Sequence, residues 1–136
     1  MDSKEIQKEV KDSVKIFGRH VYGNLYGVKR EYLMDPNLLS KTISECASVG
    51  NMHIVELVTR KFDRYLGAEG GVSVIALIEE SHMTIHTWPE GEYATIDIYS
   101  CGEASDPEKA FKYITSVLKP KTFKLFKVDR GTTRAR

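Results

Sequence analysis

A twelve-residue stretch from Glu79 to Glu90 gathers most of the side chains in this chain that could do chemistry. It reads Glu-Glu-Ser-His-Met-Thr-Ile-His-Thr-Trp-Pro-Glu, so acids, a hydroxyl and two histidines lie close together. An apolar run precedes it and an alternating run follows it, which places it at a connection between two strands. A hairpin connection needs no such set of side chains, so we take this stretch as the candidate site.

Ser81 is the candidate nucleophile of the stretch. A serine in a turn is usually only a turn former, so its neighbours decide the interpretation. Glu80 precedes it and His86 lies five residues on, while Ser73 begins the preceding strand and Cys101 follows the next one. A hairpin meander can bring these strand ends together, which would place a hydroxyl, an imidazole and a thiol in one site.

Zinc is one alternative use of His82, His86 and Cys101. The His-x3-His spacing suits a zinc site on a helix, but the threonines, isoleucine and proline of this segment make a poor helix. On a strand, residues four apart lie about 13 Å from each other, which is too far for one metal ion. We therefore expect no metal here.

A Ser-His-acid hydrolase triad is a second alternative, since Ser81, His86 and several carboxylates are present. Against it, the serine lacks the G-x-S-x-G elbow, and the nearest glycines lie well upstream. His53 fits a structural role and Cys46 fits the buried stripe of a helix. Cys101 differs, because it follows a strand and precedes a glycine, so we expect it to be partly accessible.

Composition excludes several classes of function. The chain has 136 residues, of which 41% are hydrophobic and 29% charged, with a formal net charge of +1. That balance is typical of one soluble domain over 1–136 and gives no reason to expect nucleic acid or a membrane surface as a partner. No apolar run reaches membrane-spanning length, and the charged start is no signal peptide. We expect a cytoplasmic protein, whose two cysteines form no disulfide framework.

Two helices are clearly delimited by the residues at their ends. Asp35 and Asp106 are good N-caps, and each precedes a proline, which fits the first helical position. The helices are predicted at 36–50 and 107–118. The remaining segments are predicted as strands at 20–28, 52–62, 72–78, 83–88, 93–99 and 122–128, with a flexible extension at 1–17 and a polar tail at 129–136.

The order of these elements is β-α-β-β-β-β-α-β, with most strands joined as hairpins. Such an order argues for an α+β fold, a two-layer sandwich of an antiparallel sheet and helices. His20 and Tyr22 on the first strand either line a pocket or pack against neighbours, and the sequence leaves both open.

The segment from Glu80 to Glu90 closely resembles the self-cleavage segment of the small prokaryotic S-adenosylmethionine decarboxylases. Its E-S-H-x-x-I-H-T-W-P pattern is highly specific. The likeness extends over most of 18–120, including the runs Gly71-Val72-Ser73 and Ser100-Cys101-Gly102. The resemblance implies the same fold and a proenzyme that cuts itself.

In such a proenzyme, the resemblance implies that the Ser81 hydroxyl attacks the Glu80 carbonyl and forms an ester. Elimination then releases a beta chain, 1–80, and leaves an alpha chain, 81–136, whose first residue becomes a covalent pyruvoyl cofactor. This group forms a Schiff base with the substrate amine and accepts electrons during decarboxylation. By position, Ser73 and His86 assist processing, His86 as proton acceptor, and Cys101 is the catalytic proton donor. The family also implies a homodimer, or a higher assembly, of alpha/beta protomers.

The substrate is a small molecule of polyamine biosynthesis, and the family has two branches. The S-adenosylmethionine branch typically reads W-P-E-Y-G-Y-A, whereas this chain has Gly91 and Glu92 after Glu90. The departure favours the branch that converts L-arginine to agmatine and CO2. Glu90 and Glu92 are candidate carboxylates for the guanidinium, although Glu90 equally suits a ribose diol.

Two alternatives stay open at this point. One is an S-adenosylmethionine decarboxylase, which makes the aminopropyl donor for spermidine synthesis. The other is a regulatory paralogue that keeps the fold and does not cleave, which the divergence around Gly91 and Glu92 motivates.

Overall fold

The structure is a computed structural model that describes residues 18–64 and 69–131, so the predicted extension at 1–17 lies outside it. Within these ranges the chain forms the predicted strands and two long helices, with two short helical turns added. The elements in chain order are β1 (Gly18–Tyr26), α2 (Arg30–Leu33), α3 (Pro36–Val49), β2 (Ile54–Lys61), β3 (Val72–Ile78), β4 (Ser81–Trp88), η1 (Pro89–Gly91), β5 (Tyr93–Cys101), α4 (Pro107–Leu118) and β6 (Thr122–Arg130).

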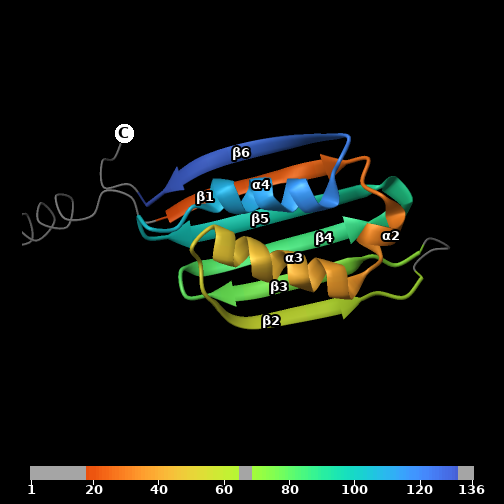
Figure 1. Ribbon diagram of the computed structural model, residues 1–136, viewed down its shortest axis with the longest axis horizontal. Coiled ribbons are helices and arrows are strands. Elements are labelled where there is room, and N and C mark those ends of the chain that lie inside the picture. The colour runs from red at the N-terminus through yellow and green to blue at the C-terminus, as the bar shows by residue number, and fades with distance from the viewer. Residues whose placement is uncertain (1–17, 65–68, 132–136) are drawn as a thin grey trace, which may run out of the picture.

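The strands form one sheet in the order β2-β3-β4-β5-β1-β6, and every neighbouring pair is antiparallel. Helices α3 and α4 lie side by side over one face of this sheet (Figure 1). Helix α3 packs on the side of β2 and β3, and α4 packs on the side of β1 and β5. The predicted two-layer α+β sandwich is therefore confirmed, and no described element covers the second face of the sheet.

The caps of both long helices are formed as predicted. The Asp35 carboxylate accepts hydrogen bonds from the backbone N–H groups of Asn37 at 3.0 Å and Leu38 at 3.1 Å. The Asp106 carboxylate accepts one from Lys109 N–H at 3.0 Å. These bonds satisfy donors that the first helical turn would otherwise leave unpaired. None of the helices in the described ranges combines the length and apolar content that crossing a bilayer requires.

The core lies between the helices and one face of the sheet. Strand residues that point toward the helices are buried in alternation, as in Val72, Val74 and Ala76 of β3. On the opposite face of β3, Ile75 is 46% exposed and Leu77 is 50% exposed. The sequence indicated a strand that is apolar on both faces, and a single chain buries only one of them.

Element boundaries shift by one or two residues from those predicted. Strand β1 ends at Tyr26 because Gly27 takes a left-handed backbone with φ of 71°. Strand β4 begins at Ser81 itself, two residues earlier than predicted. Asp129 and Arg130, predicted as the start of a polar tail, belong to β6 and pair with β1, and residues 132–136 lie outside the described ranges.

Gly71 allows the backbones of β3 and β4 to approach closely. A Cβ at this position would collide with the carbonyl oxygen of Thr87, a residue whose hydroxyl also accepts from Val72 N–H at 2.8 Å. We expect Gly71→Ala to lower the free energy of unfolding by about 1–3 kcal/mol through overpacking. Urea unfolding measures this, on a chain kept uncleaved by Ser81→Ala. Gly91→Ala is the matched control, because its Cβ would meet only Tyr93 Cβ at 3.6 Å. Equal stability of the two variants would contradict the close-approach argument.

Candidate active site

Ser81 is the first residue of β4 and follows a two-residue turn, Glu79–Glu80, that joins it to its cross-strand partner Ile78. The turn is as short as an antiparallel hairpin allows. Ser81 is half-buried and shares the strand parity of Met83, which points into the core. Its hydroxyl lies 3.5 Å from Nδ1 of His82, a long contact. The sequence predicted Ser81 in the turn before this strand, whereas the structure makes it the first residue of the strand, directly after the turn.

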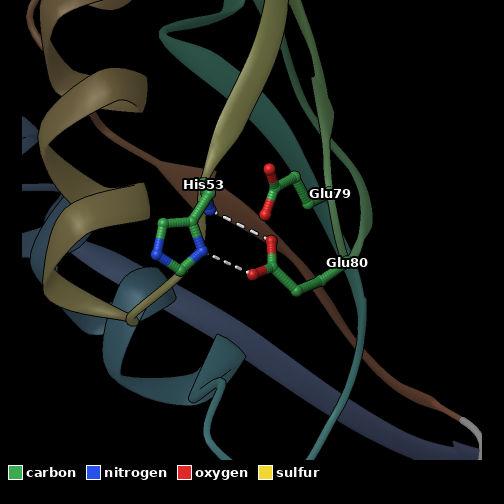
Figure 2. Close-up of side chains that lie close together, drawn as sticks. All are labelled: His53, Glu79 and Glu80. Carbon is green, nitrogen blue, oxygen red and sulfur yellow. Dashed lines mark hydrogen bonds and ion pairs between the residues drawn. The ribbon is translucent and has the colours of Figure 1, made fainter.

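Glu80, the residue before Ser81, is hydrogen-bonded through both its backbone carbonyl and its side-chain carboxylate. Its carbonyl oxygen accepts a hydrogen bond from Cys101 N–H at 3.0 Å. Its carboxylate accepts from the backbone N–H of His53 at 3.0 Å and lies 2.7 Å from Nδ1 of the same histidine (Figure 2). The Glu80–Ser81 peptide bond is therefore positioned from two other parts of the chain.

These contacts shift the ionisation of both partners. Burial of Glu80 raises the pKa of its carboxyl, but the hydrogen bonds from the backbone and ring of His53 outweigh burial and hold that pKa below its ordinary value. The hydrogen bond to Glu80 raises the pKa of His53, and the negative charges of Glu80 and Glu79 add to this effect. Near neutral pH the pair therefore favours an imidazolium facing a carboxylate.

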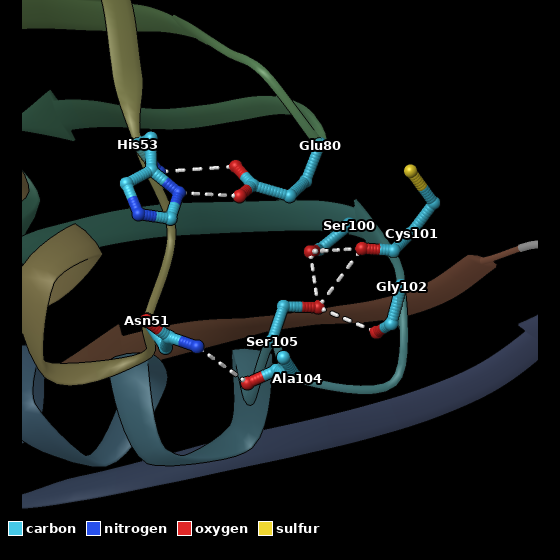
Figure 3. A network of polar contacts seen from close by, with 8 residues as sticks. All are labelled: Asn51, His53, Glu80, Ser100, Cys101, Gly102, Ala104 and Ser105. Atoms are coloured by element: carbon cyan, nitrogen blue, oxygen red, sulfur yellow. Dashed lines mark hydrogen bonds and ion pairs between the residues drawn. The ribbon is translucent and has the colours of Figure 1, made fainter.

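Cys101 ends β5, and the loop behind it is fixed by hydroxyl groups. The Ser105 hydroxyl lies 3.1 Å from the carbonyl oxygen of Cys101 and 3.0 Å from that of Gly102, and Ser100 donates to it at 2.7 Å. The Cys101 sulfur points away from this network (Figure 3). The thiol is exposed, as the sequence predicted. By contrast Cys46 is buried, and burial raises the pKa of its thiol.

Ser73 and His86 form a second group on the open face of the sheet. They are cross-strand partners in β3 and β4, and the Ser73 hydroxyl lies 2.6 Å from His86 Nδ1. Five residues separate His86 from Ser81, and at about 3.3 Å per residue the two lie roughly 16 Å apart along β4. The sequence predicted that Ser73, Ser81, His86 and Cys101 lie together. A single chain holds two groups instead: the Glu80–Ser81 bond with the Cys101 backbone, and Ser73 with His86.

Because β4 is a regular strand from Ser81 onward, His86 lies far from Ser81. The same geometry argues against the zinc site and the hydrolase triad. His82 and His86 lie on one strand four residues apart, so they do not share a metal ion. Ser81 and His86 are too far apart within one chain for a hydrolase triad. On β1, Nε2 of His20 lies 3.0 Å from the carboxylate of Asp97, and the same residue lines a cavity of about 380 Å³, so the two roles that the sequence left open coexist.

A cavity of about 490 Å³ adjoins the Ser73–His86 pair. Its described lining includes Trp88, one basic side chain, Arg64, and three acidic side chains, Asp63, Glu69 and Glu90. The sequence indicated Glu90 as a candidate for substrate binding and gave no motif that points to Asp63 or Glu69. Glu92 is exposed, takes a left-handed backbone after η1 and is not among the described lining residues.

His53 makes contacts that the sequence did not predict. The sequence predicted a structural residue, yet the His53 side chain contacts Glu80, the residue before Ser81. Together with Glu79 and Glu80 it forms a group whose potential metal-binding atoms all lie within 4.8 Å of one another. No spacing signal indicates a contact between residues 27 positions apart in different hairpins. Only the docking of the segment after α3 against the β3–β4 turn brings these groups together.

Comparison with known proteins places this geometry in a family. A family model described as S-adenosylmethionine decarboxylase matches residues 19–131. An arginine decarboxylase proenzyme from Hyperthermus butylicus is 53% identical over 117 residues, which cover 86% of this chain and 80% of that protein. An arginine decarboxylase proenzyme from Ignicoccus hospitalis is 49% identical over 128 residues, covering 94% and 85%.

A solved structure carries the same fold. The crystal structure of the adenosylmethionine decarboxylase from Aquifex aeolicus is similar with a TM-score of 0.79 and 28% sequence identity, covering 90% of this chain and 97% of that one. The fold, the sequence relatives and the family match over nearly all described residues agree. This chain belongs to the S-adenosylmethionine decarboxylase family.

Proposed function

We propose that this chain is a self-processing, pyruvoyl-dependent decarboxylase that converts L-arginine to agmatine and CO2. The observation that carries the proposal is the pair of relatives, 53% and 49% identical, that are both named arginine decarboxylase proenzyme. The hydrogen bond from Cys101 N–H to the Glu80 carbonyl supports the processing step, and the exposed Cys101 thiol supports the return of a proton after decarboxylation. The substrate is taken from those relatives and from the lining of the cavity.

Self-cleavage begins when the Ser81 oxygen attacks the Glu80 carbonyl carbon. The C–N bond breaks, the hydroxyl proton passes to the Ser81 nitrogen, and an ester links the two chains. A base then removes the Ser81 α-proton and Glu80 leaves as a carboxylate. Water replaces the nitrogen, which departs as ammonia, and residue 81 becomes a pyruvoyl group. During attack, negative charge grows on the Glu80 oxygen, where the Cys101 N–H already donates at 3.0 Å.

The residues around the turn fit a pyruvoyl group at position 81. When formed, that group supplies an electrophilic ketone that withdraws electrons from the bond to the departing carboxylate. The Cys101 thiol is exposed at the end of β5, next to Ser100, the cross-strand partner of Ser81. It can therefore return a proton after CO2 leaves.

We propose that the working unit is a homodimer, because one chain holds its polar groups in two separate clusters. The open face of the sheet carries the Ser73–His86 pair together with exposed apolar side chains that a partner would bury. Those on the open face are Val58, Ile75, Leu77, Trp88, Phe126 and Val128. We propose that a two-fold dimer through this face brings His86 of the partner subunit to the end of the sheet that carries the Glu80–Ser81 bond and the open-face residue Cys101.

We propose that the cavity beside His86 takes a small cationic amino acid, because its described lining carries three carboxylates against one guanidinium, that of Arg64. Its volume of about 490 Å³ lies within the range of small-ligand pockets. We propose that Glu90 and Asp63 or Glu69 accept the guanidinium, which matches carboxylates in a planar, two-pronged geometry. Glu92 contributes its backbone to the neighbouring turn, where its carbonyl accepts from Val28 N–H at 3.0 Å.

Release of labelled CO2 tests the substrate. The purified, cleaved protein should release CO2 from carboxyl-labelled arginine and much less from lysine, which has an ammonium in place of the guanidinium. S-adenosylmethionine is the second arm of the assay, because the family and the Aquifex aeolicus structure carry that name. Release from S-adenosylmethionine alone would overturn the arginine proposal. A chain that stays intact under native conditions would favour the regulatory paralogue.

A further inference from the structure

The segment between α3 and β2 is docked against the turn that carries Glu80. The backbone N–H of Glu79 donates to the His53 carbonyl at 2.8 Å, and the backbone N–H of His53 donates to the Glu80 carboxylate at 3.0 Å. Two residues earlier, the Asn51 amide donates to the Ala104 carbonyl at 3.1 Å, in the loop after Cys101. The segment 51–53 thus contacts both the turn before Ser81 and the loop after Cys101 (Figure 3).

Glu80 is therefore fixed at two points that lie on either side of its carbonyl carbon. Its carbonyl oxygen is held by Cys101 N–H, and its side chain is held by His53 through two contacts of 3.0 and 2.7 Å. The Glu80 side chain is 17% exposed and that of His53 is 60% exposed. A residue anchored at both ends has little freedom to rotate its carbonyl away from the Ser81 hydroxyl.

We infer that His53 is a positioning residue for self-cleavage, which holds Glu80 so that its carbonyl carbon stays within reach of the Ser81 oxygen. The inference rests on the proposed self-processing function and deepens it. His53 does not touch the reacting atoms in the structure, so it acts through Glu80. The same contact also stabilises the cleaved chain, because scission gives Glu80 a second carboxylate next to the His53 imidazolium.

Charge strengthens this contact near neutral pH. The carboxylates of Glu80 and Glu79 both raise the pKa of His53, and they are the charged groups that face it from the turn. Below that raised pKa the ring is protonated, and above the lowered pKa of Glu80 the carboxyl is ionised. Between the pKa values of Glu80 and His53 both groups are charged and their contact is strongest. The contact weakens as pH rises through the pKa of His53.

Time-resolved mass spectrometry of the full chain during cell-free synthesis tests the inference. Wild-type chain should convert to the fragments 1–80 and 81–136, and His53→Ala should do so about tenfold more slowly, as loss of a hydrogen bond to a charged group implies. His53→Asn keeps a donor near the Nδ1 position, so it should cleave within about threefold of wild type. The cleavage rate of His53→Asn should also lack the pH dependence that titration of the His53 ring gives to the wild-type chain.

Two further variants separate positioning from a general loss of structure. Glu80→Ala removes the same contact from the other side, so the double variant with His53→Ala should cleave no more slowly than the slower single variant. Lys127→Met breaks an exposed ion pair of 2.9 Å with Glu108, remote from the turn, and should cleave at the wild-type rate.

The outcomes are distinguishable from failure of the proposed function. A wild-type chain that never cleaves refutes the function itself. A wild-type chain that cleaves, with His53→Ala cleaving equally fast, refutes only the positioning role. Multiplying effects in the double variant, or a pH profile of His53→Asn identical to that of wild type, would also overturn it.

Discussion

Ser81→Ala leaves the chain as one species with the mass of all 136 residues and abolishes CO2 release. Alanine has no hydroxyl to attack the Glu80 carbonyl, so no ester forms and position 81 never becomes a ketone. Because Ser81 is only half-buried and begins a strand whose pairing depends on backbone groups, we expect the variant to fold. Intact mass under native conditions and labelled CO2 release measure the two losses together.

Ser81→Cys is the matched control for this result. A thiol keeps a nucleophile at the same place, so this chain should still cleave, at a rate that differs from that of serine. Cleavage of the Ser81→Ala chain between residues 80 and 81 would exclude the proposed acyl shift. Decarboxylation by the uncleaved chain would show instead that the activity needs no group derived from Ser81.

Much of the fold was predictable because its signals are local. Asp35 and Asp106 cap helices whose starts depend on backbone donors within three residues, so a single sequence contains the whole cause. The alternation of β4 and β5 likewise indicates which residues face the helices. Boundaries were less predictable where a glycine conformation decides them, as at Gly27, whose φ of 71° ends β1.

The candidate site was predictable in its residues and not in its arrangement. The types and order of Ser73, Ser81, His86 and Cys101 indicated the chemistry, but their grouping depends on where β4 begins. A strand that starts at Ser81 carries His86 away from it, and that start was predicted two residues too late. Contacts between distant segments, such as His53 with Glu80, leave no periodic trace in the sequence.

The apolar pattern of β3 connects these two results. A strand that is apolar on both faces is typical of a position between two layers, whereas one chain provides only the helical layer. The exposure of Ile75 and Leu77 and the separation of the Ser73–His86 pair from Ser81 therefore share one explanation. A second copy of the sheet would resolve both, by burying the apolar face and by completing each site.

Mixed dimers of two inactive variants regain activity if each site combines two subunits. Cys101→Ala removes the proposed proton donor, and His86→Ala removes the proposed proton acceptor, so each homodimer should be inactive. In a heterodimer one site carries both substitutions and the other carries neither. Heterodimers isolated through two different tags after co-expression should therefore show about half of the wild-type activity. Labelled CO2 release per dimer measures this.

The pairing of variants gives the control for this experiment. Ser73 and His86 lie together in one cluster, with 2.6 Å between hydroxyl and ring nitrogen. A heterodimer of Ser73→Ala with His86→Ala therefore has one substitution in each composite site and should stay as impaired as its parents, whereas Ser73→Ala with Cys101→Ala should regain activity. If every site lies within one chain, each heterodimer site keeps one substitution and no pair complements. Complementation by the first pair and by none of the others would contradict the two-cluster arrangement.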